Sequence, residues 1–511
     1  MNLAWKETVS ALIGATGLIA SGVGCATVDA TADYQRVREH VAAATGQSTL
    51  YKPADDALVA ERVATLLADG VTVDEAVQVA LLNNPRFQAS CMDVGLARAD
   101  LVQSGLLTNP TVGMSMRMPS GGGLVNIEAS IAQNIADLWQ LPVRKQVARQ
   151  ALDQAILTLA AQASTLAADA KRAYFTAVGA DRVLAITQEN LDTAGHVLEL
   201  TIARRDAGAG NELDVNLSRS LVLEAELTRT TARLAAANAH RNLATLMGLT
   251  RRSDDVNLID PLPDALASTL DDEHLLAFAR EHRLDVRSAE TAITVADAQL
   301  EQAWQNVFPN LTLGFELERN SRRRQRGRSL LADTARASAA AGTLTGPGFQ
   351  PQSNRSNSPI AILGPSLSAT LPLFDQNQAQ IAKAEIDVRR ARKTYEAVER
   401  AVTQEVIGAI DQARTAWQLA ALYRDRYLPL AERSLELSRE SYQAGEAPFL
   451  SVLEAQQFLL GARRRHVEAV QAAAVTIPAI ERTVGRPWHE MLGEKPATGE
   501  PTEPLSVDEG K

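Results

Sequence analysis

Residues 442–455 read YQAGEAPFLSVLEA, and this stretch decides the fold. It ends a run of about 68 helix-compatible residues, 377–444, and starts another helix: Gly445 permits a left-handed C-cap, and Pro448 suits a first helical turn. A helix of that length would reach roughly 100 Å at ~1.5 Å per residue, far beyond an ordinary globular domain. The sequence therefore predicts that the chain reverses at the tip of a long helical hairpin.

A similar turn occurs earlier in the chain. Residues 206–218 read DAGAGNELDVNLS, and aligning Leu213 with Leu450 places Gly208 on Gly445. Gly210 belongs to the same predicted tip. Two long hairpins with matching tips indicate a duplicated chain, and a repeat has to be identified before any other argument about the fold.

A second match supports the duplication. Residues 84–113 and 285–314 align without a gap, with Asn109 on Asn310 and Gly113 on Gly314. We therefore expect two structural repeats with a linker between them. The predicted boundaries are 71–250 for the first repeat, 251–270 for the linker and 271–486 for the second repeat.

The composition indicates a folded protein rich in long helices. Of the 511 residues, 46% are hydrophobic and 22% charged, but only 4% are aromatic, as in helices that pack through small side chains. The net charge of −10 argues against nucleic acid as a partner. The seven histidines have no metal-ligand spacing, and no phosphate loop or nucleophile motif occurs. We therefore expect neither an enzyme nor a cofactor or metal site.

The N-terminus resembles a bacterial lipoprotein signal. Lys6 precedes an apolar run at residues 9–20, and Ser-Gly-Val-Gly lies directly before Cys25. Residues 1–25 are therefore predicted to be a signal that ends at a lipid-anchored Cys25. Export without lipidation and an apolar N-terminal core segment are the alternatives. Residues 26–70 are expected to form an arm along the main body.

Four segments alternate apolar and polar residues with the period of a half-buried strand. Residues 110–118 and 125–131 form one pair, and residues 310–317 and 366–373 form the other. In the first segment Val112, Met114, Met116 and Met118 share one face. Alternating strands of about ten residues suit a transmembrane β-barrel, although a soluble sandwich would show the same pattern. Four strands are too few to close a barrel, whereas three chains would supply twelve.

The remaining segments are long and helical. Their charges recur every few residues, so none is expected to cross a membrane. An apolar stripe in residues 388–402 predicts antiparallel coiled-coil packing. Pro142 is expected to mark a helix start and Pro429 to kink its helix. The predicted helices are 144–207, 214–247, 271–306, 377–444 and 451–484.

Two further segments are not expected to join the helices or strands. Residues 319–359, between the second pair of strands, carry the basic run SRRRQRGR and are expected to be a loop. If the strands cross an outer membrane, this loop would face outside, near lipopolysaccharide phosphates. Residues 487–511 are predicted to be a disordered acidic tail.

This arrangement resembles the TolC-like outer-membrane efflux family of outer-membrane factor lipoproteins. The resemblance covers roughly residues 72–485, and the order and duplication of the elements are its specific features. Residues 95–107 are somewhat closer to the heavy-metal efflux branch. The motifs that carry the resemblance are LTNPTV at 107–112, FPNLTL at 308–313, LPLFD at 371–375 and the glycine-marked tips.

The resemblance implies an α+β membrane protein, internally duplicated and assembled as a homotrimer. Long antiparallel coiled-coil helices would form a trimeric periplasmic α-barrel, continued by a 12-stranded outer-membrane β-barrel with four strands per chain. It also implies a passive duct that takes substrate from an inner-membrane pump of the resistance-nodulation-division (RND) class through a periplasmic adaptor. The protein would lie in the outer membrane of a Gram-negative-type bacterium, lipid-anchored, with a large periplasmic portion.

The resemblance also assigns the functional residues. Asp214, Ser451 and Glu454 match the positions that narrow the periplasmic entrance, with Ser451 where an aspartate often occurs. Three-fold symmetry would repeat the two carboxylates as rings, which favour cations. The alternative is that both are ordinary solvated acids at helix starts, which favour the helix dipole. The hairpin tips, expected to contact the adaptor, carry Gly208, Gly210, Gly445 and Pro448.

Two other functions remain open from the sequence. The duct of a type I protein secretion system would share this architecture. A non-channel coiled-coil scaffold would explain the helices, but not the alternating strands or the N-terminal signal.

Overall fold

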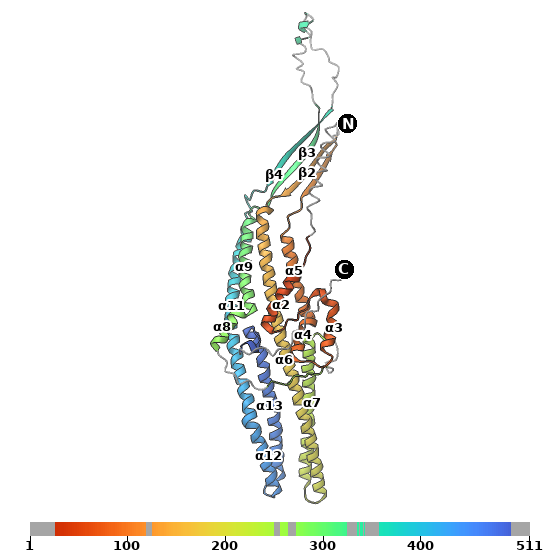
Figure 1. Ribbon diagram of the computed structural model, residues 1–511, viewed down its shortest axis with the longest axis vertical. Helices are drawn as coiled ribbons and strands as arrows, with labels where there is room; N and C mark the ends of the chain where they lie inside the picture. Colours follow the sequence, from red (N-terminus) through yellow and green to blue (C-terminus); the bar gives the residue numbers. More distant parts are fainter. Residues whose placement is uncertain are drawn as a thin grey trace, which may run out of the picture. The chain divides into compact units, whose positions relative to one another are not determined.

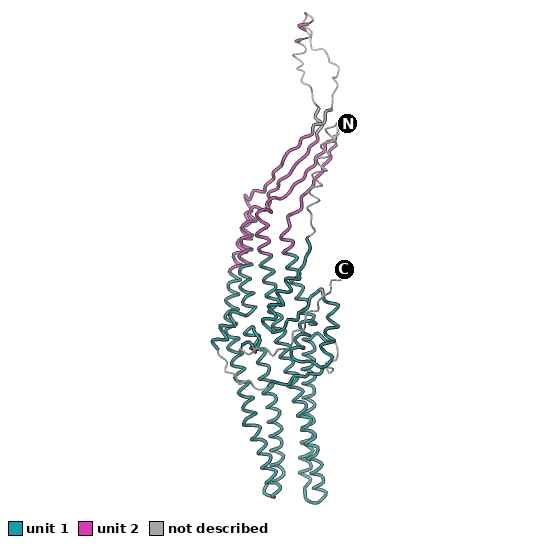
Figure 2. The backbone as a smooth tube through the Cα atoms, in the orientation of Figure 1, with its two compact units in different colours: residues 1–100, 149–295, 389–511 teal, residues 101–148, 296–388 magenta. Residues whose placement is uncertain are grey.

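The structure is a computed structural model, and it divides into two compact units, which Figure 2 distinguishes by colour. Unit 1 contains residues 1–100, 149–295 and 389–511, and unit 2 contains residues 101–148 and 296–388. The residues described are 26–118, 125–249, 256–263, 272–323, 335–336, 338–340, 342 and 357–491.

The same order of elements occurs twice along the chain: two helices, a pair of strands, then a long helical hairpin (Figure 1). No helix among the described residues combines the length and the apolar character needed to cross a membrane. The first set is α4 Val73–Asn83, α5 Pro85–Ser104, β1 Thr111–Arg117, β2 Asn126–Asn134, α6 Asp137–Asp206 and α7 Glu212–Leu246. The second is α8 Asp272–His282, α9 Leu284–Gln305, β3 Leu311–Arg323, β4 Asn357–Ala369, α11 Gln378–Leu422, a π-helical turn Tyr423–Tyr427, α12 Leu428–Gln443 and α13 Phe449–Val484.

The four strands form one antiparallel sheet in unit 2, in the order β1-β2-β3-β4. The register brings most apolar residues of the four strands onto one face, because Met114 faces Ala129, which in turn faces Leu317, and Leu317 faces Leu363. Ile362 is an exception, since it pairs with Glu318 on the opposite face. Val112 and Leu363 on this face are 78% and 70% exposed. The opposite face carries Ser115, Glu128, Ser130, Glu316 and Ser366.

The predicted pairs of strands are confirmed, but the last strand was misplaced. The sequence predicts it at residues 366–373, whereas β4 spans Asn357–Ala369 and pairs with the whole of β3. Leu371 and Leu373 continue the apolar alternation beyond the end of the strand, and both are exposed. The predicted loop 319–359 is shorter as well, since β3 extends to Arg323.

Two predicted helices also differ from the structure. The helix predicted at 271–306 is divided into α8 and α9 at Arg283, a buried residue. Its guanidinium binds Asp285 at 2.6 Å and Glu405 at 2.8 Å, which ties the break to α11. The helix start predicted at Pro142 was wrong, because α6 begins at Asp137.

Both ends of the described chain belong to unit 1 and pack within it. The arm contains α2 Thr31–Thr45 and α3 Asp56–Leu66, and the buried Tyr34 hydroxyl donates to the Cys91 carbonyl at 2.9 Å. The disorder predicted from residue 487 was placed too early. Trp488–Met491 forms helix α14, and the Trp488 ring lies 5.7 Å from that of Trp417. Residues 492–511 lie outside the described part.

Candidate functional site

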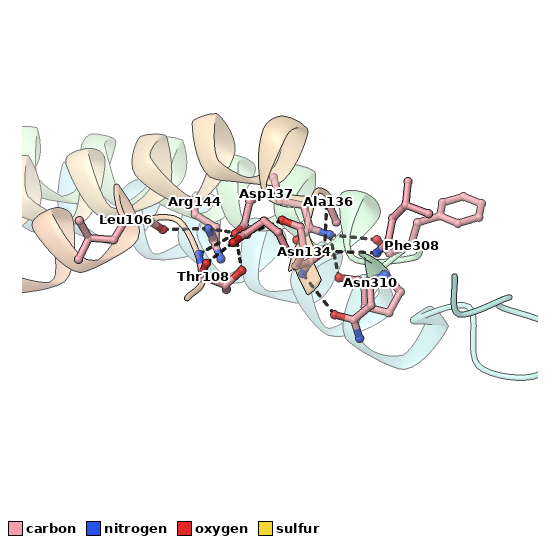
Figure 3. Close-up of polar contacts among 12 residues, drawn as sticks. Leu106, Thr108, Asn134, Ala136, Asp137, Arg144, Phe308 and Asn310 are labelled. Carbon is pink, nitrogen blue, oxygen red and sulfur yellow. Dashed lines mark hydrogen bonds and ion pairs between the residues drawn. The ribbon is translucent and has the colours of Figure 1, made fainter. Parts of the chain in front are cut away.

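The first turn of α6 holds the end of the sheet in place, as Figure 3 shows. Asp137 is 1% exposed and accepts two hydrogen bonds from Thr108, from the backbone N–H at 2.7 Å and from the hydroxyl at 2.6 Å. Its other carboxylate oxygen accepts from Arg144 at 3.0 Å. Asp137 therefore fixes the segment that leads into β1 to the start of α6.

The segment that leads into β3 is held by the same end of α6 (Figure 3). The Gln140 amide of α6 donates to the Phe308 carbonyl at 3.0 Å. Asn134, the last residue of β2, adds a contact just before the helix, since its side-chain oxygen accepts from the Leu311 N–H at 3.3 Å. Thr108 and Phe308 belong to the corresponding motifs LTNPTV and FPNLTL. The start of α6 thus forms hydrogen bonds with the segments that lead into β1 and into β3. The physical role of the two motifs is to make these hydrogen bonds.

Hydrogen bonding outweighs burial at Asp137. Burial alone would raise the pKa of this carboxyl, but the hydrogen bonds from Thr108 and the neighbouring Arg144 charge lower it below its usual value of 3.8. The carboxylate is therefore ionised at neutral pH and strengthens the contacts it accepts.

The hairpin tips lie in unit 1 and share one turn geometry. Gly208 and Gly445 have φ of 74° and 76°, the left-handed conformation that ends a helix. The residue after each glycine donates its N–H to the carbonyl five residues earlier, at 2.8 Å for Ala209 and 2.9 Å for Glu446. This is the Schellman pattern, so the alignment of the two tips has a structural counterpart. Pro448 lies directly before α13 with φ of −72°.

The structure places the three predicted entrance residues near the starts of the hairpin helices that follow the tips, Asp214 and Ser451 in the first turn and Glu454 in the second. Asp214 lies in the first turn of α7, half-buried, and its N–H donates to the Asn211 cap at 2.8 Å. Ser451 uses its hydroxyl locally, donating to the Pro448 carbonyl at 2.7 Å. Glu454 is exposed on α13. Among the described residues, neither the Asp214 nor the Glu454 carboxylate forms an ion pair, so both remain available as charges.

Sequence reasoning missed the contacts that join the two hairpins. The Arg204 guanidinium lies 4.9 Å from the centre of the Tyr442 ring, and Tyr442 packs against Phe449 at 5.6 Å. Leu453 on α13 packs with Ala194 and Leu221 of the first hairpin. Tyr442 opens the stretch that decides the fold, but no sequence pattern indicated its partner. These contacts hold the α13 tip against the first hairpin.

Of the two cysteines, Cys91 is the one that lies among the described residues. Cys25 lies outside that part of the chain. Cys91 is fully buried, and burial raises the pKa of its thiol to about 12, so it is protonated. Within the described ranges, no group of three or more His, Cys, Asp and Glu side chains could hold a metal ion.

Most of the chain matches a known family. Residues 76–249 and 275–486 match the profile of a family described as Outer membrane efflux protein. The pyoverdine export outer membrane protein OpmQ of Pseudomonas aeruginosa is 25% identical, over 81% of this chain and 85% of OpmQ. The probable efflux pump outer membrane protein TtgC of Pseudomonas putida is 23% identical, over 92% and 94%. The cobalt-zinc-cadmium resistance protein CzcC of Cupriavidus metallidurans is 21% identical, over 82% and 91%.

Solved structures share the fold. The outer-membrane channel OprN superposes with a TM-score of 0.61 at 18% identity, over 87% of this chain and 96% of OprN. CusC superposes with a TM-score of 0.60 at 19% identity, over 83% and 92%.

Replacing Asp137 with asparagine tests the junction. Asp137→Asn removes the charge that faces Arg144 and should cost about 1–3 kcal/mol of unfolding free energy. Because the pKa of Asp137 is lowered in the folded protein, its contribution is present above its usual pKa and is lost as the pH falls through the folded value. The measurement is the Tm of the detergent-extracted protein at pH 7 and pH 3, where the variant should differ from the parent less at pH 3.

The matched control is Asp153→Asn, which removes a partly exposed ion pair with Arg36. Such pairs contribute about 0–1 kcal/mol, so the control should change the Tm much less. Equal losses of Tm in the two variants would contradict the role given to Asp137.

Proposed function

The chain belongs to the outer membrane efflux protein family, and from this membership we propose how its sheet and hairpins form a channel. It is the outer-membrane channel component of an efflux system and lies in the outer membrane with a large periplasmic portion. Family members of this kind work with an adaptor and an inner-membrane pump and are not enzymes.

We propose that the sheet forms one third of a 12-stranded barrel. Within the described residues β1 and β4 each pair on one side only, so the sheet has two open edges. Each strand has an exposed large apolar residue on the apolar face, namely Val112, Ile131, Phe315 and Leu363, as a lipid-facing wall would have. Backbone groups in lipid must all be paired, which only a closed barrel achieves for strands. Three copies would close it with 12 strands, within the known range.

The two hairpins offer matching surfaces for a trimer. One is the α7 stripe, an exposed leucine row with coiled-coil spacing: Leu213, Leu223, Leu227 and Leu234. The other is the α11–α12 stripe: Leu419, Leu422, Leu430 and Leu437.

These stripes would pack against each other between neighbouring copies. Leu227 is 70% and Leu430 59% exposed in the single chain. Two different surfaces that bind head to tail generate a closed ring when the rotation closes. The two structural repeats, residues 71–250 and 271–486, would each contribute two strands and one hairpin. The twelve helical segments of three chains would then enclose a periplasmic tunnel.

The entrance of this tunnel would lie at the hairpin tips. The Asp214 and Glu454 carboxylates lie there without an ion pair among the described residues, and three-fold symmetry would repeat each as a ring. Such rings attract cations and repel anions. Ser451 replaces an acid, so the constriction would be less acidic than in relatives with aspartate. The exposed tip residues Gly208 and Gly445, with Gly210 and Pro448, are the proposed adaptor contact.

The relatives do not indicate which substrate this chain transports, because relatives of similar identity are named for different substrates. Their names refer to pyoverdine export, efflux and cobalt-zinc-cadmium resistance, at identities of 25%, 23% and 21%. Three points therefore stay predictions: membership of the heavy-metal efflux branch, an RND-type pump as partner, and lipidation of Cys25. A coiled-coil scaffold is disfavoured, since it would have no use for an exposed apolar sheet face.

The entrance charges are tested by single-channel conductance in planar bilayers. We expect Asp214→Asn with Glu454→Gln to weaken cation selectivity, measured as a reversal potential in a salt gradient, because the two carboxylate rings are removed. The control removes two acids of the N-terminal arm, Glu61→Gln with Asp69→Asn, and should leave the reversal potential unchanged. If the parent conducts and the two variants behave alike, the entrance assignment is wrong.

The leucine stripes are tested by the mass of the detergent-extracted particle. The parent particle should contain three copies of the chain. Leu227→Glu places a charge in the α7 stripe and should dissociate the trimer, since burying one leucine contributes about 1.5–3 kcal/mol per interface. Leu200→Glu, at an exposed leucine of α6 outside both stripes, is the control and should remain trimeric. Light scattering that finds Leu227→Glu fully trimeric would refute the interface.

A further inference from the structure

A large groove lies where the two structural repeats meet, and all of its lining belongs to unit 1. Its volume is about 1010 Å³, enough to hold a small organic molecule. The lining comes from the start of α5, the middle of α6, the end of α7, the start of α9 and one residue of α11. Asn84 and Asp285, which occupy equivalent positions in the two repeats, both contribute to it.

Hydrogen bonds between different helices fix the walls of this groove. The Asn84 amide donates to the Leu246 carbonyl at 2.8 Å, which joins the start of α5 to the end of α7. The hydroxyls of Thr158 on α6 and Ser288 on α9 form a second link, at 2.9 Å. The walls are therefore held together without a ligand, and such preorganisation lowers the entropic cost of binding.

The groove lies on the face of α6 that points away from the N-terminal arm. Gln154 and Thr158, one helical turn apart, line the groove on one face of the helix. Other faces of α6 carry the fully buried Ile156 and Asp153, which binds Arg36 of α2 at 2.6 Å. In the proposed channel the arm covers the outside of the tunnel wall, so the groove opens into the tunnel.

The lining carries two opposite charges that are open to a ligand. Arg86 is exposed and has no ion pair among the described residues, so its guanidinium can bind a carboxylate. Asp169 forms only a loose ion pair with Arg172, at 3.8 Å, and 43% of its side chain is exposed. The third charged residue, Asp285, is already bound by Arg283 at 2.6 Å.

We propose that this groove binds zwitterionic, amphipathic organic molecules on their way through the tunnel. Arg86 would hold a carboxylate of the ligand, and Asp169 an ammonium group. The apolar part of the ligand would lie against leucines of α6 and of the end of α7: Leu166, Leu246 and Leu249.

This inference rests on the proposed channel function and names its substrate class. It agrees with the proposed entrance, because rings of carboxylates repel a net anion. A molecule whose carboxylate is balanced by an ammonium group is not repelled as a net anion, and it can still present its carboxylate to Arg86.

Two fluorescent probes test the groove. Nε-dansyl-lysine has an apolar naphthalene ring, a carboxylate and an ammonium group, and dansylcadaverine is the same molecule without the carboxylate. Arg86→Gln should weaken binding of dansyl-lysine about tenfold, through the loss of one charge-assisted hydrogen bond, and leave binding of dansylcadaverine unchanged. The measurement is a fluorescence titration of the detergent-extracted full chain, corrected for the signal of protein-free detergent.

Arg287→Gln is the matched control. Arg287 is the equivalent of Arg86 in the second repeat, is also exposed and has no ion pair among the described residues, but does not line the groove. The control should leave the affinity of both probes unchanged. Equal losses in the two variants, or no binding of dansyl-lysine to the parent, would overturn the proposal.

A conductance measurement separates the groove from the channel function. Dansyl-lysine should lower the single-channel current of the parent and of Arg287→Gln in planar bilayers, and that of Arg86→Gln only at about tenfold higher concentration. A probe that binds without lowering the current would show that the groove does not open into the tunnel, and the proposal would be wrong. Binding that depends on Arg86 in a protein that does not conduct would contradict the channel function alone.

Discussion

The structure depends on a sheet that one chain cannot complete. Its outer strands β1 and β4 pair on one side only within the described residues, and its apolar face is exposed from Val112 to Leu363. In water such a sheet would aggregate through its edges, and in lipid its unpaired backbone groups would be costly. Both problems disappear when copies of the sheet close into a barrel with the apolar face outward. The proposed trimer is therefore the form in which this sheet would be stable in a membrane.

The helices support the assembly of several copies in two ways: one helix end positions the sheet, and two helical surfaces can bind a neighbouring copy. The first turn of α6 receives both strand entries through Asp137 and Gln140, so the start of the sheet is set by one helix. In unit 1 the α7 stripe and the α11–α12 stripe provide two different surfaces for a neighbouring copy. The π-turn between Leu422 and Leu430 adds one residue to the usual seven-residue spacing, which keeps both leucines on one face despite Pro429. The π-helical turn is thus compatible with assembly through this stripe.

Much of the fold was predictable because its signals are local. Period-two alternation located the two pairs of strands, and the glycines 208 and 445 located the tips. Alternation did not show where β4 ends, because pairing of Ala369 with Leu311 decides that, while Leu371 and Leu373 continue the pattern unpaired. The break at Arg283 and the Arg204–Tyr442 contact depend on partners far along the chain, which no local pattern reveals. The entrance residues came only from resemblance, since an acid at a helix start is common on local grounds.

The most direct test of this account is which face of the sheet meets lipid. Spin labels placed in turn at Val112, Gly113, Met114 and Ser115 in vesicle-reconstituted protein report access to oxygen, which concentrates in lipid, and to a water-soluble nickel chelate. We predict strict alternation, with oxygen favoured at Val112 and Met114 and nickel at Gly113 and Ser115. Equal access at all four positions, or nickel favoured at Met114, would contradict the lipid-facing sheet and the channel built on it.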